Sequence, residues 1–294
     1  MSRPRTTVQW PLERRYVVPE LVLRGRRFAW GERTYVMGII NVTPDSFSGD
    51  GVGGDIAAAV ALARGFEHGG ADILDVGGES SRPGADPVTP EEEAARVLPA
   101  IAAIRSATGL PIAVDTYHSL VAERALAAGA DIVNDITGFR FDAEMAAVVA
   151  RHRAVAVLMH NQRGRTTTDV ADDVTAGLRE SIRLAKGAGI PAGRIILDPG
   201  FGFGWKPEQN LELLRRLPEL WELELPLLVG TSRKSTLGLV VDEPVDARLE
   251  ASLASAAIAV AGGADIVRAH DVRETVRVVA VTDAIVRGRW RAAP

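Results

Sequence analysis

Cysteine is absent from this chain of 294 residues. Its absence excludes disulfide bonds, and it also excludes thiolate groups as metal ligands or nucleophiles. A surplus of positive charge is missing as well, because the formal net charge at pH 7 is −4. A general nucleic-acid-binding protein normally carries a basic domain, so we expect no nucleic-acid partner. Any anionic ligand must then be bound by a local group of positive side chains.

Long hydrophobic runs are also lacking. The first thirty residues contain several arginines and short apolar pieces, without the continuous apolar core of a secretory signal. An organellar transit peptide is the remaining alternative. The longest apolar stretch, residues 249–267, is interrupted by Glu250 and Asp265, which indicates a buried helix and strand rather than a membrane span. We therefore expect a soluble, cytoplasmic protein with no membrane partner.

The chain does contain a repeat of strand-length apolar runs that each end at a polar or charged residue. Eight such runs are separated by helix-sized segments, and they cover residues 36–41, 73–75, 112–115, 132–134, 155–160, 195–198, 225–234 and 266–270. Strands that alternate with helices indicate parallel βα units. Eight such units predict an α/β fold of the (β/α)8 type, the TIM barrel.

The carboxyl ends of barrel strands converge on one mouth, where active sites of this fold lie. Polar and charged residues at or beside the ends of these runs should therefore face a common cavity, and we expect this set to be Asn41, Asp115, Asn134, Asp198, Lys234, Arg268 and His270. This ring is the candidate active site. Two long connections, residues 43–54 and 79–90, follow strands at the same mouth. Such connections are often lids, and an ordinary surface loop is the alternative.

We expect one barrel domain, residues 34–294, preceded by an N-terminal extension, residues 1–33. Barrels of this kind commonly run to about 250 residues as a single unit. Residues 28–35 have the pattern of two strands joined at Gly31 and Glu32. They are expected to form a β-hairpin that plugs the N-terminal end of the barrel, away from the chemistry.

Positive groups gather where the seventh and eighth strands end. Lys234 precedes a helical turn, and it is one of only three lysines in the chain. Arg268 and His270 are two residues apart, so they share one face of an extended strand. Barrels often bind anions in this region, and the cluster is expected to hold a phosphate or pyrophosphate. The alternatives are a solvated surface lysine and a structural histidine.

Asp115, Asn134 and Asp198 end three other runs. A carboxylate buried there is costly unless other groups donate hydrogen bonds to it. A heterocycle with amino and ring N–H groups would supply such donors, and an asparagine offers a donor and an acceptor to the same edge. The alternative is a structural network in which these carboxylates pair with Arg268 or Lys234.

The glycine-rich segment 198–204 lacks the spacing of a dinucleotide-binding loop. We expect its glycines to let the backbone approach a flat ligand, with Phe203 available to stack. A zinc site is not expected, because His68, His118 and His152 fall on predicted helices without ligand-like spacing.

Five segments resemble the dihydropteroate synthase family: residues 41–48 (NVTPDSFS), 75–84 (DVGGESSRPG), 198–204 (DPGFGFG), 232–234 (SRK) and 268–271 (RAHD). The resemblance runs from about residue 34 to the end. It implies a TIM-barrel homodimer with a Mg2+ cofactor, a transferase that joins 4-aminobenzoate to 6-hydroxymethyl-7,8-dihydropterin diphosphate. The implied products are pyrophosphate and 7,8-dihydropteroate, the latter for folate biosynthesis.

The resemblance also implies roles for individual residues. The pterin-binding set is implied to be Asp115, Asn134, Asp198 and Lys234, with Arg268 stacking nearby, and we expect catalysis to depend on Asp115, Asp198, Lys234 and Arg268. Asn41 resembles the residue that reaches the magnesium ion and the diphosphate. The remaining diphosphate contacts are implied to be Ser81, Arg82, Arg268 and His270. The aminobenzoate side is implied to be lined by Pro83, Phe203 and Ser232. Asp45 lies in one of two segments, 45–50 and 79–84, that resemble mobile loops over the substrates.

The implied chemistry is a dissociative displacement. The departing diphosphate gains negative charge, which Mg2+ and nearby cations could stabilise, and the electron-rich dihydropterin shares the positive charge left behind. The arylamine nucleophile is neutral at pH 7, so no strong general base is required. A homodimer is also indicated by the segment 247–261, which is small and apolar nearly all round, as expected for a helix buried against a second subunit.

Three departures from the family pattern lie beside the matched residues. Gly49 separates Ser48 from the acidic Asp50, Trp205 stands in the place of a lysine, and residues 160–163 read HNQR instead of HMRG. Two alternative functions stay open. One is a methyltetrahydrofolate-dependent methyltransferase on the same barrel, which has no need of Arg82 or the 232–234 segment. The other is a pterin-binding barrel without synthase activity.

Overall fold

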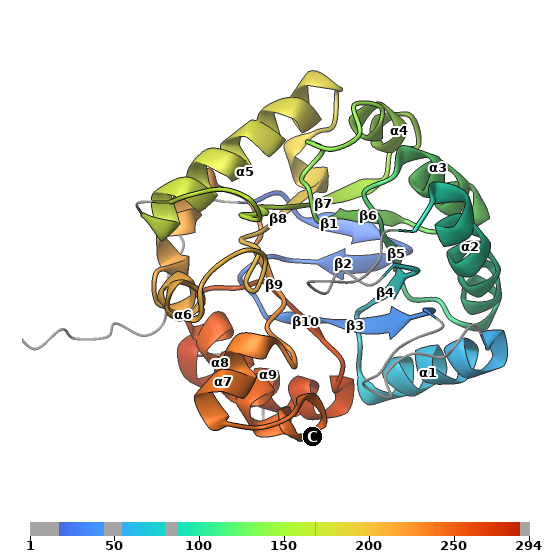
Figure 1. Ribbon diagram of the computed structural model, residues 1–294. Helices are drawn as coiled ribbons and strands as arrows, with labels where there is room; N and C mark the ends of the chain where they lie inside the picture. The colour runs from blue at the N-terminus through green and yellow to red at the C-terminus, as the bar shows by residue number, and fades with distance from the viewer. Residues whose placement is uncertain (1–17, 44–54, 80–87, 168, 289–294) are drawn as a thin grey trace, which may run out of the picture.

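Eight parallel strands form the centre of the molecule, and helices surround them in the computed structural model, which describes residues 18–43, 55–79, 88–167 and 169–288 (Figure 1). The strands are β3 (Tyr35–Asn41), β4 (Ile73–Gly77), β5 (Ile112–Asp115), β6 (Ile132–Asp135), β7 (Val155–Met159), β8 (Ile195–Asp198), β9 (Leu228–Val229) and β10 (Ile266–Ala269). They are ordered β8-β7-β6-β5-β4-β3-β10-β9, and a parallel bridge between Leu197 and Leu227 joins the two ends of this order. The predicted (β/α)8 barrel is confirmed.

Helices connect successive strands on the outside of the barrel. They are α1 (Ile56–Gly69), α2 (Pro90–Ala107), α3 (Ser119–Ala128), α4 (Met145–Arg151), α5 (Val170–Gly187), α6 (Pro207–Arg215), α7 (Ser235–Val241), α8 (Leu249–Ala261) and α9 (Val272–Val286). Local sequence sets their ends. Thr89 and Glu92 form a reciprocal capping box at the start of α2, and Gly129 ends α3 in the left-handed conformation. None of the described helices is both long enough and apolar enough to span a membrane.

The strands alternate between two apolar layers. In β4, Ile73 belongs to the cluster inside the barrel, whereas Leu74 and Val76 pack in the layer between the strands and the helices. The same alternation runs through β6, where Ile132 points inward and Val133 outward. Because side chains alternate along a strand, a polar residue two positions after an inward apolar residue also points into the barrel. This register directs the strand-end side chains toward the mouth.

A hairpin closes the other end of the barrel, as predicted, but the predicted position was wrong. Its strands are β1 (Leu21–Leu23) and β2 (Arg26–Phe28), joined through Arg24 and Gly25. Both joining residues have positive φ, the conformation that a two-residue type I′ turn requires and that glycine adopts most easily. Leu21 and Phe28 pack on the inward residues of the barrel strands. Residues 35–41, in contrast, form the first barrel strand.

The segment predicted as the seventh strand, residues 225–234, is extended for only part of its length. Regular strand pairing is confined to Leu228 and Val229. Arg233 has a φ of 56°, which breaks the extended backbone, and the carbonyl of Thr231 accepts a hydrogen bond from the Lys234 N–H at 3.2 Å. Lys234 therefore lies on a turn directly before α7, and its side chain can reach across the mouth.

Candidate active site

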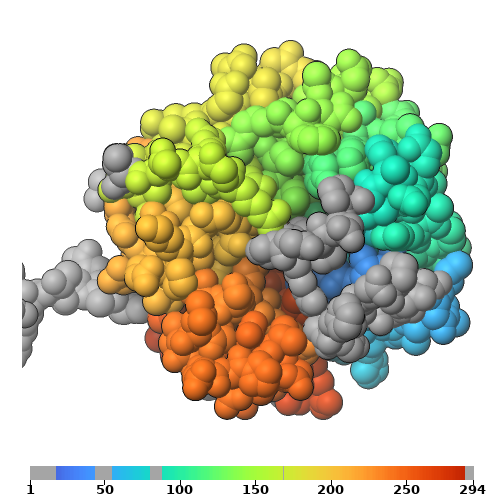
Figure 2. Space-filling model, viewed as in Figure 1, coloured from blue at the N-terminus to red at the C-terminus, as the bar shows by residue number. Residues whose placement is uncertain are grey.

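The described strand-end residues of the predicted ring meet at the carboxyl end of the barrel. Figure 2 shows the molecule from the side of this mouth, with the atoms of residues 230–250, in orange, along its lower edge. Asn41 ends β3, Asp115 ends β5, Asp198 ends β8, and Asn134 and Arg268 are the next-to-last residues of β6 and β10. Ser232, Lys234 and His270 lie on the connections that follow β9 and β10. The ring thus combines carboxylates, amides and cations.

Arg268 is the centre of a charged network inside the mouth. Its Nε donates to Asp75 Oδ2 at 2.5 Å, and its Nη2 donates to Asp115 Oδ2 at 2.6 Å. Asn134 Nδ2 donates to the same oxygen of Asp75 at 3.2 Å. Burial opposes the charge on Arg268, but the two carboxylates outweigh that effect and keep its pKa above the ordinary value. The pairing of Asp115 with Arg268, considered above as a structural alternative, is therefore present.

Asp75 was missed as a site residue, because the sequence indicated it only as the end of a short run. It is fully buried, and its Oδ1 has no hydrogen-bond partner among the described residues. The signal that could have found it is the two-residue period from Ile73, which turns Asp75 into the barrel. An unpartnered carboxylate oxygen in this position can accept a hydrogen bond from a ligand.

Lys234 crosses the mouth over the glycine-rich segment. Its Nζ donates to the carbonyl of Phe201 and lies 4.3 Å from the ring centre of Phe203, within the range of a cation–π contact. Gly202 makes this path possible, because a Cβ at that position would lie 2.6 Å from Lys234 Cδ. Arg163 approaches the same ring at 5.0 Å. Two cations therefore contact the ring of Phe203.

Burial raises the pKa of the carboxyl groups at the mouth and lowers that of the lysine. It raises the pKa of Asp115 to about 7, against the opposing charge of Arg268. It also raises the pKa of Asp198, although Lys234 and the Gly200 N–H, 2.8 Å from Asp198 Oδ1, favour the ionised form. Burial lowers the pKa of Lys234 to about 7. Shifts of this size are typical of functional sites, since they mark ionisable groups that are held away from water.

Two further predicted residues are joined by hydrogen bonds. Ser232 Oγ lies 2.9 Å from His270 Nδ1, and the His270 N–H donates to Ser232 Oγ at 3.2 Å. Asn41 lies beside Asp115, because its Oδ1 and Asp115 Oδ2 are 3.8 Å and 3.9 Å from the position of a Cβ on Gly77. The predicted residues Asp45, Ser81, Arg82 and Pro83 lie outside the described residues, as does the departure at Asp50.

The two described departures from the family pattern contact each other. Trp205 is buried, and its ring centre lies 5.7 Å from that of His160. His160 Nε2 is in turn 2.9 Å from Gln162 Oε1, and burial lowers the pKa of His160 to about 4. Trp205 therefore packs behind the glycine-rich segment, while Lys206 is an exposed residue at the start of α6.

Comparison with known proteins agrees with this geometry. The family described as "Pterin binding enzyme" matches residues 37–270, so the barrel and its mouth define a pterin-binding barrel enzyme. The dihydropteroate synthase of Clostridium beijerinckii is 47% identical over 89% of this chain and 98% of its own length. That of Bacillus subtilis is 43% identical over 87% of this chain and 90% of its own length. The chain therefore belongs to the dihydropteroate synthase family.

Solved structures extend the comparison to three dimensions. The Clostridium difficile dihydropteroate synthase, solved in the presence of pteroic acid, has a TM-score of 0.84 and 45% identity, over 87% of this chain and 98% of that one. The Xanthomonas albilineans enzyme, solved with 4-aminobenzoic acid, also has a TM-score of 0.84, with 42% identity over 91% of this chain and 98% of that one. The barrel of this chain thus matches those of two solved dihydropteroate synthases over 87% and 91% of its length.

Proposed function

We propose that this protein is a dihydropteroate synthase of folate biosynthesis. It condenses 6-hydroxymethyl-7,8-dihydropterin diphosphate with 4-aminobenzoate and releases 7,8-dihydropteroate and pyrophosphate. The observation that carries the proposal is the inward-facing group of Asp115, Asn134, Asp198 and Lys234 in a chain whose synthase relatives match it over nearly their full length. A related enzyme from Xanthomonas albilineans has been solved in complex with 7,8-dihydropteroate.

The pterin is assigned to the buried carboxylates. Asp115 and Asp198 have raised pKa values because they have lost water, and the amino and ring N–H groups of a pterin would replace the lost hydrogen bonds. Asn134 can donate to and accept from the same heterocycle edge, and Asp75 Oδ1 is a further acceptor. Lys234 would donate to a pterin acceptor, and Arg268 would stack nearby.

The diphosphate is assigned to the positive side of the mouth. Arg268 and His270 supply cationic or N–H donors, and Ser81 and Arg82 are proposed from the family pattern to add further contacts. Asn41 offers one neutral oxygen beside Asp115, which suits Mg2+, because this ion usually takes few protein ligands together with water and substrate phosphates. Bound there, Mg2+ would stabilise the negative charge that develops on the leaving diphosphate.

The aminobenzoate is assigned to the side of the mouth formed by Phe203 and Ser232, with Pro83 proposed from the family pattern. Asp45 is proposed from the same pattern as a further substrate-binding residue. We propose that the C–O bond to the diphosphate breaks first and that the dihydropterin shares the positive charge on its methylene carbon. The neutral arylamine then attacks that carbon and loses a proton. Arg268 stabilises the departing charge electrostatically. Because the arylamine is already neutral when it attacks, water can take up the proton that it then loses, and the protein needs no strong base.

We further propose that the protein is a homodimer. Helices α8 and α9 pack side by side, and both carry exposed apolar residues, Ile258 on α8 and Val281 and Ile285 on α9. Exposed apolar residues on neighbouring helices are a candidate interaction site, and a two-fold dimer is the commonest way to cover such residues. A cytoplasmic location stays a prediction from the sequence.

Pyrophosphate release tests the proposed reaction. Purified protein is given the dihydropterin diphosphate, Mg2+ and 4-aminobenzoate, and each component is omitted in turn. We expect release that depends on every component and that Lys234→Ala abolishes, while circular dichroism shows the variant to be folded. Folded wild-type protein that binds the pterin but releases no pyrophosphate would instead favour a pterin-binding barrel without synthase activity, or a methyltransferase.

A further inference from the structure

We propose that Glu79, Glu93 and His118 form a binding site for a first-row divalent cation such as Zn2+, separate from the diphosphate site near Asn41. The three residues come from three places in the sequence. Glu79 follows β4, Glu93 lies in the first turn of α2, and His118 directly precedes α3. The barrel brings these segments together at the rim of its mouth, because β4 and β5 are neighbouring strands.

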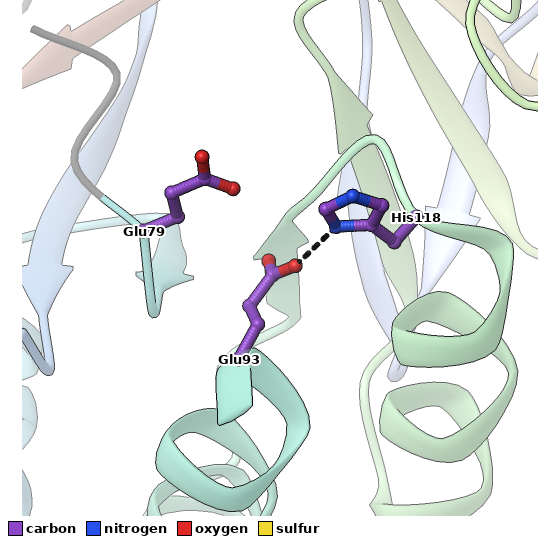
Figure 3. A group of neighbouring side chains, drawn as sticks. All are labelled: Glu79, Glu93 and His118. Carbon is purple, nitrogen blue, oxygen red and sulfur yellow. Dashed lines mark hydrogen bonds and ion pairs between the residues drawn. The ribbon is translucent and has the colours of Figure 1, made fainter. Parts of the chain in front are cut away.

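The geometry is close to that of a ligand set. One potential ligand atom from each residue lies within 4.8 Å of the others. Figure 3 shows the two carboxylates and the imidazole turned toward one another, with the Glu93 side chain between Glu79 and His118. His118 Nδ1 and Glu93 Oε2 are 2.7 Å apart. Small changes of side-chain rotamer would let all three groups contact one ion.

An independent observation points to a missing ligand. Glu93 is only 1% exposed and interacts with the side chains of His118 and Thr116, yet its Oε1 has no hydrogen-bond partner among the described residues. The buried Oε2 of Glu79 has none either in that part of the chain. A carboxylate oxygen buried without a partner is costly, and the pair with His118 satisfies only one oxygen of Glu93. A cation between the two carboxylates would satisfy both unpartnered oxygens.

The donor set indicates which cation fits. One imidazole and two carboxylates suit Zn2+, Co2+ or Fe2+, whereas Mg2+ prefers oxygen ligands alone. Three protein ligands leave a fourth position for water in the tetrahedral geometry of Zn2+. The Tyr117 hydroxyl donates to Glu79 Oε1 at 2.8 Å, and such outer contacts typically orient a ligand.

The position of the site suggests a stabilising role. A bound ion would link the segments after β4 and β5 to the start of α2, and Glu79 directly precedes residues 80–87 in the sequence. The site contains none of the residues assigned above to the pterin or the diphosphate. It can therefore be tested without substrates and independently of the proposed reaction.

Metal titration tests the proposal directly. The full-length protein is stripped with EDTA and titrated with Zn2+ by calorimetry, and with Co2+ by visible absorption, without Mg2+ or substrate. We expect one equivalent to bind, with a Co2+ spectrum of nitrogen and oxygen ligation, and Zn2+ to raise the Tm. His118→Ala and Glu79→Gln should each weaken binding at least about 10-fold, the lower bound for loss of a supporting contact.

Two control variants distinguish this site from other places where a cation could bind. His152→Ala removes another His–Glu pair, 2.8 Å from Glu123, that has no third ligand among the described residues, and it should leave binding unchanged. Asn41→Ala should also leave binding unchanged, because Asn41 belongs to the proposed diphosphate site. Absence of binding to the wild type, equal binding to His118→Ala and Glu79→Gln, or loss of binding in Asn41→Ala would each overturn the proposal.

Discussion

Burial at the mouth of the barrel shifts the pKa values of Lys234 and Asp115 in opposite directions. Loss of water brings the pKa of Lys234 down, and that of Asp115 up, to about 7 in each case. Under the proposed function, the ammonium form of Lys234 and the carboxylate form of Asp115 bind the pterin. The first form is lost as the pH rises through 7, and the second is lost as the pH falls through 7.

We therefore expect a bell-shaped pH dependence of kcat/KM for the dihydropterin diphosphate, with its maximum near pH 7. Lys234→Arg should move only the alkaline limb upward, because the pKa of arginine is above about 12. Asp115→Asn should move the acidic limb to lower pH while lowering the rate, and the limb that remains is assigned to Asp198, whose pKa burial also raises. Steady-state kinetics from pH 5 to pH 9 measure both limbs. An alkaline limb that Lys234→Arg leaves in place would contradict the assignment of that limb to Lys234.

The lack of a side chain at Gly202 determines where the side chain of Lys234 can lie. Its φ of 84° is unfavourable for other residues, and an added Cβ would lie 2.6 Å from Lys234 Cδ. We expect Gly202→Ala to destabilise the fold by about 1–3 kcal/mol and to lower kcat/KM about 100-fold through displacement of Lys234. Gly187→Ala is the matched control, because its Cβ meets nothing within 4 Å. Urea unfolding and kinetics on both variants give the comparison, and equal kinetics would contradict it.

At the scale of elements, the sequence predicted the strands well where an apolar run ended at a polar residue. The ends of β5 and β8 follow from this rule, at Asp115 and Asp198, whereas β6 continues one residue beyond the predicted end at Asn134. The inward direction of a side chain was harder to predict, and Asp75 was left out of the ring although its run ended there, because the strand itself continues to Gly77. The hairpin was misplaced because Gly31 and Gly25 both provide a turn, and only packing inside the barrel decides between them.

The cluster of Glu79, Glu93 and His118 could not be predicted from the sequence. Its members follow no ligand spacing, because they belong to separate βα units that only the closed barrel brings together. The predicted helix position of His118 was nearly correct, yet its partner Glu93 lies on a different helix. Contacts between elements, unlike strand ends, depend on packing that no local pattern records.

A substitution in the hairpin is expected to change the stability of the protein without changing substrate binding. Phe28 is buried among the inward residues of the barrel, at the end away from the mouth. We expect Phe28→Ala to cost about 3–5 kcal/mol of unfolding free energy while KM for both substrates stays unchanged. Val22→Ala on the same hairpin is the control, because Val22 is 62% exposed and should change stability by less than about 0.5 kcal/mol. Urea denaturation measures the stability of both variants, and steady-state kinetics measure KM. A raised KM in folded Phe28→Ala would contradict the expectation that the hairpin affects stability alone.

For the whole molecule, the exposed apolar residues of the neighbouring helices α8 and α9 are those that we assign to a dimer interface. Dimer formation would remove them from water, and a charge placed there would then be buried without a partner. We expect Val281→Asp to convert a dimer to a monomer in analytical ultracentrifugation. Val22→Asp should leave the dimer intact, since Val22 lies on the hairpin. A wild-type protein that sediments as a monomer would rule out the proposed dimer.

Formation of the new C–N bond tests whether the protein condenses the two substrates at the mouth of its barrel. Ring-labelled 4-aminobenzoate is supplied with the dihydropterin diphosphate and Mg2+, and labelled 7,8-dihydropteroate and pyrophosphate are quantified together. We expect one labelled product for each pyrophosphate, and loss of both in folded Asp198→Asn. Pyrophosphate that appears without labelled product would contradict it, because the protein would then hydrolyse the diphosphate instead of transferring the pterin.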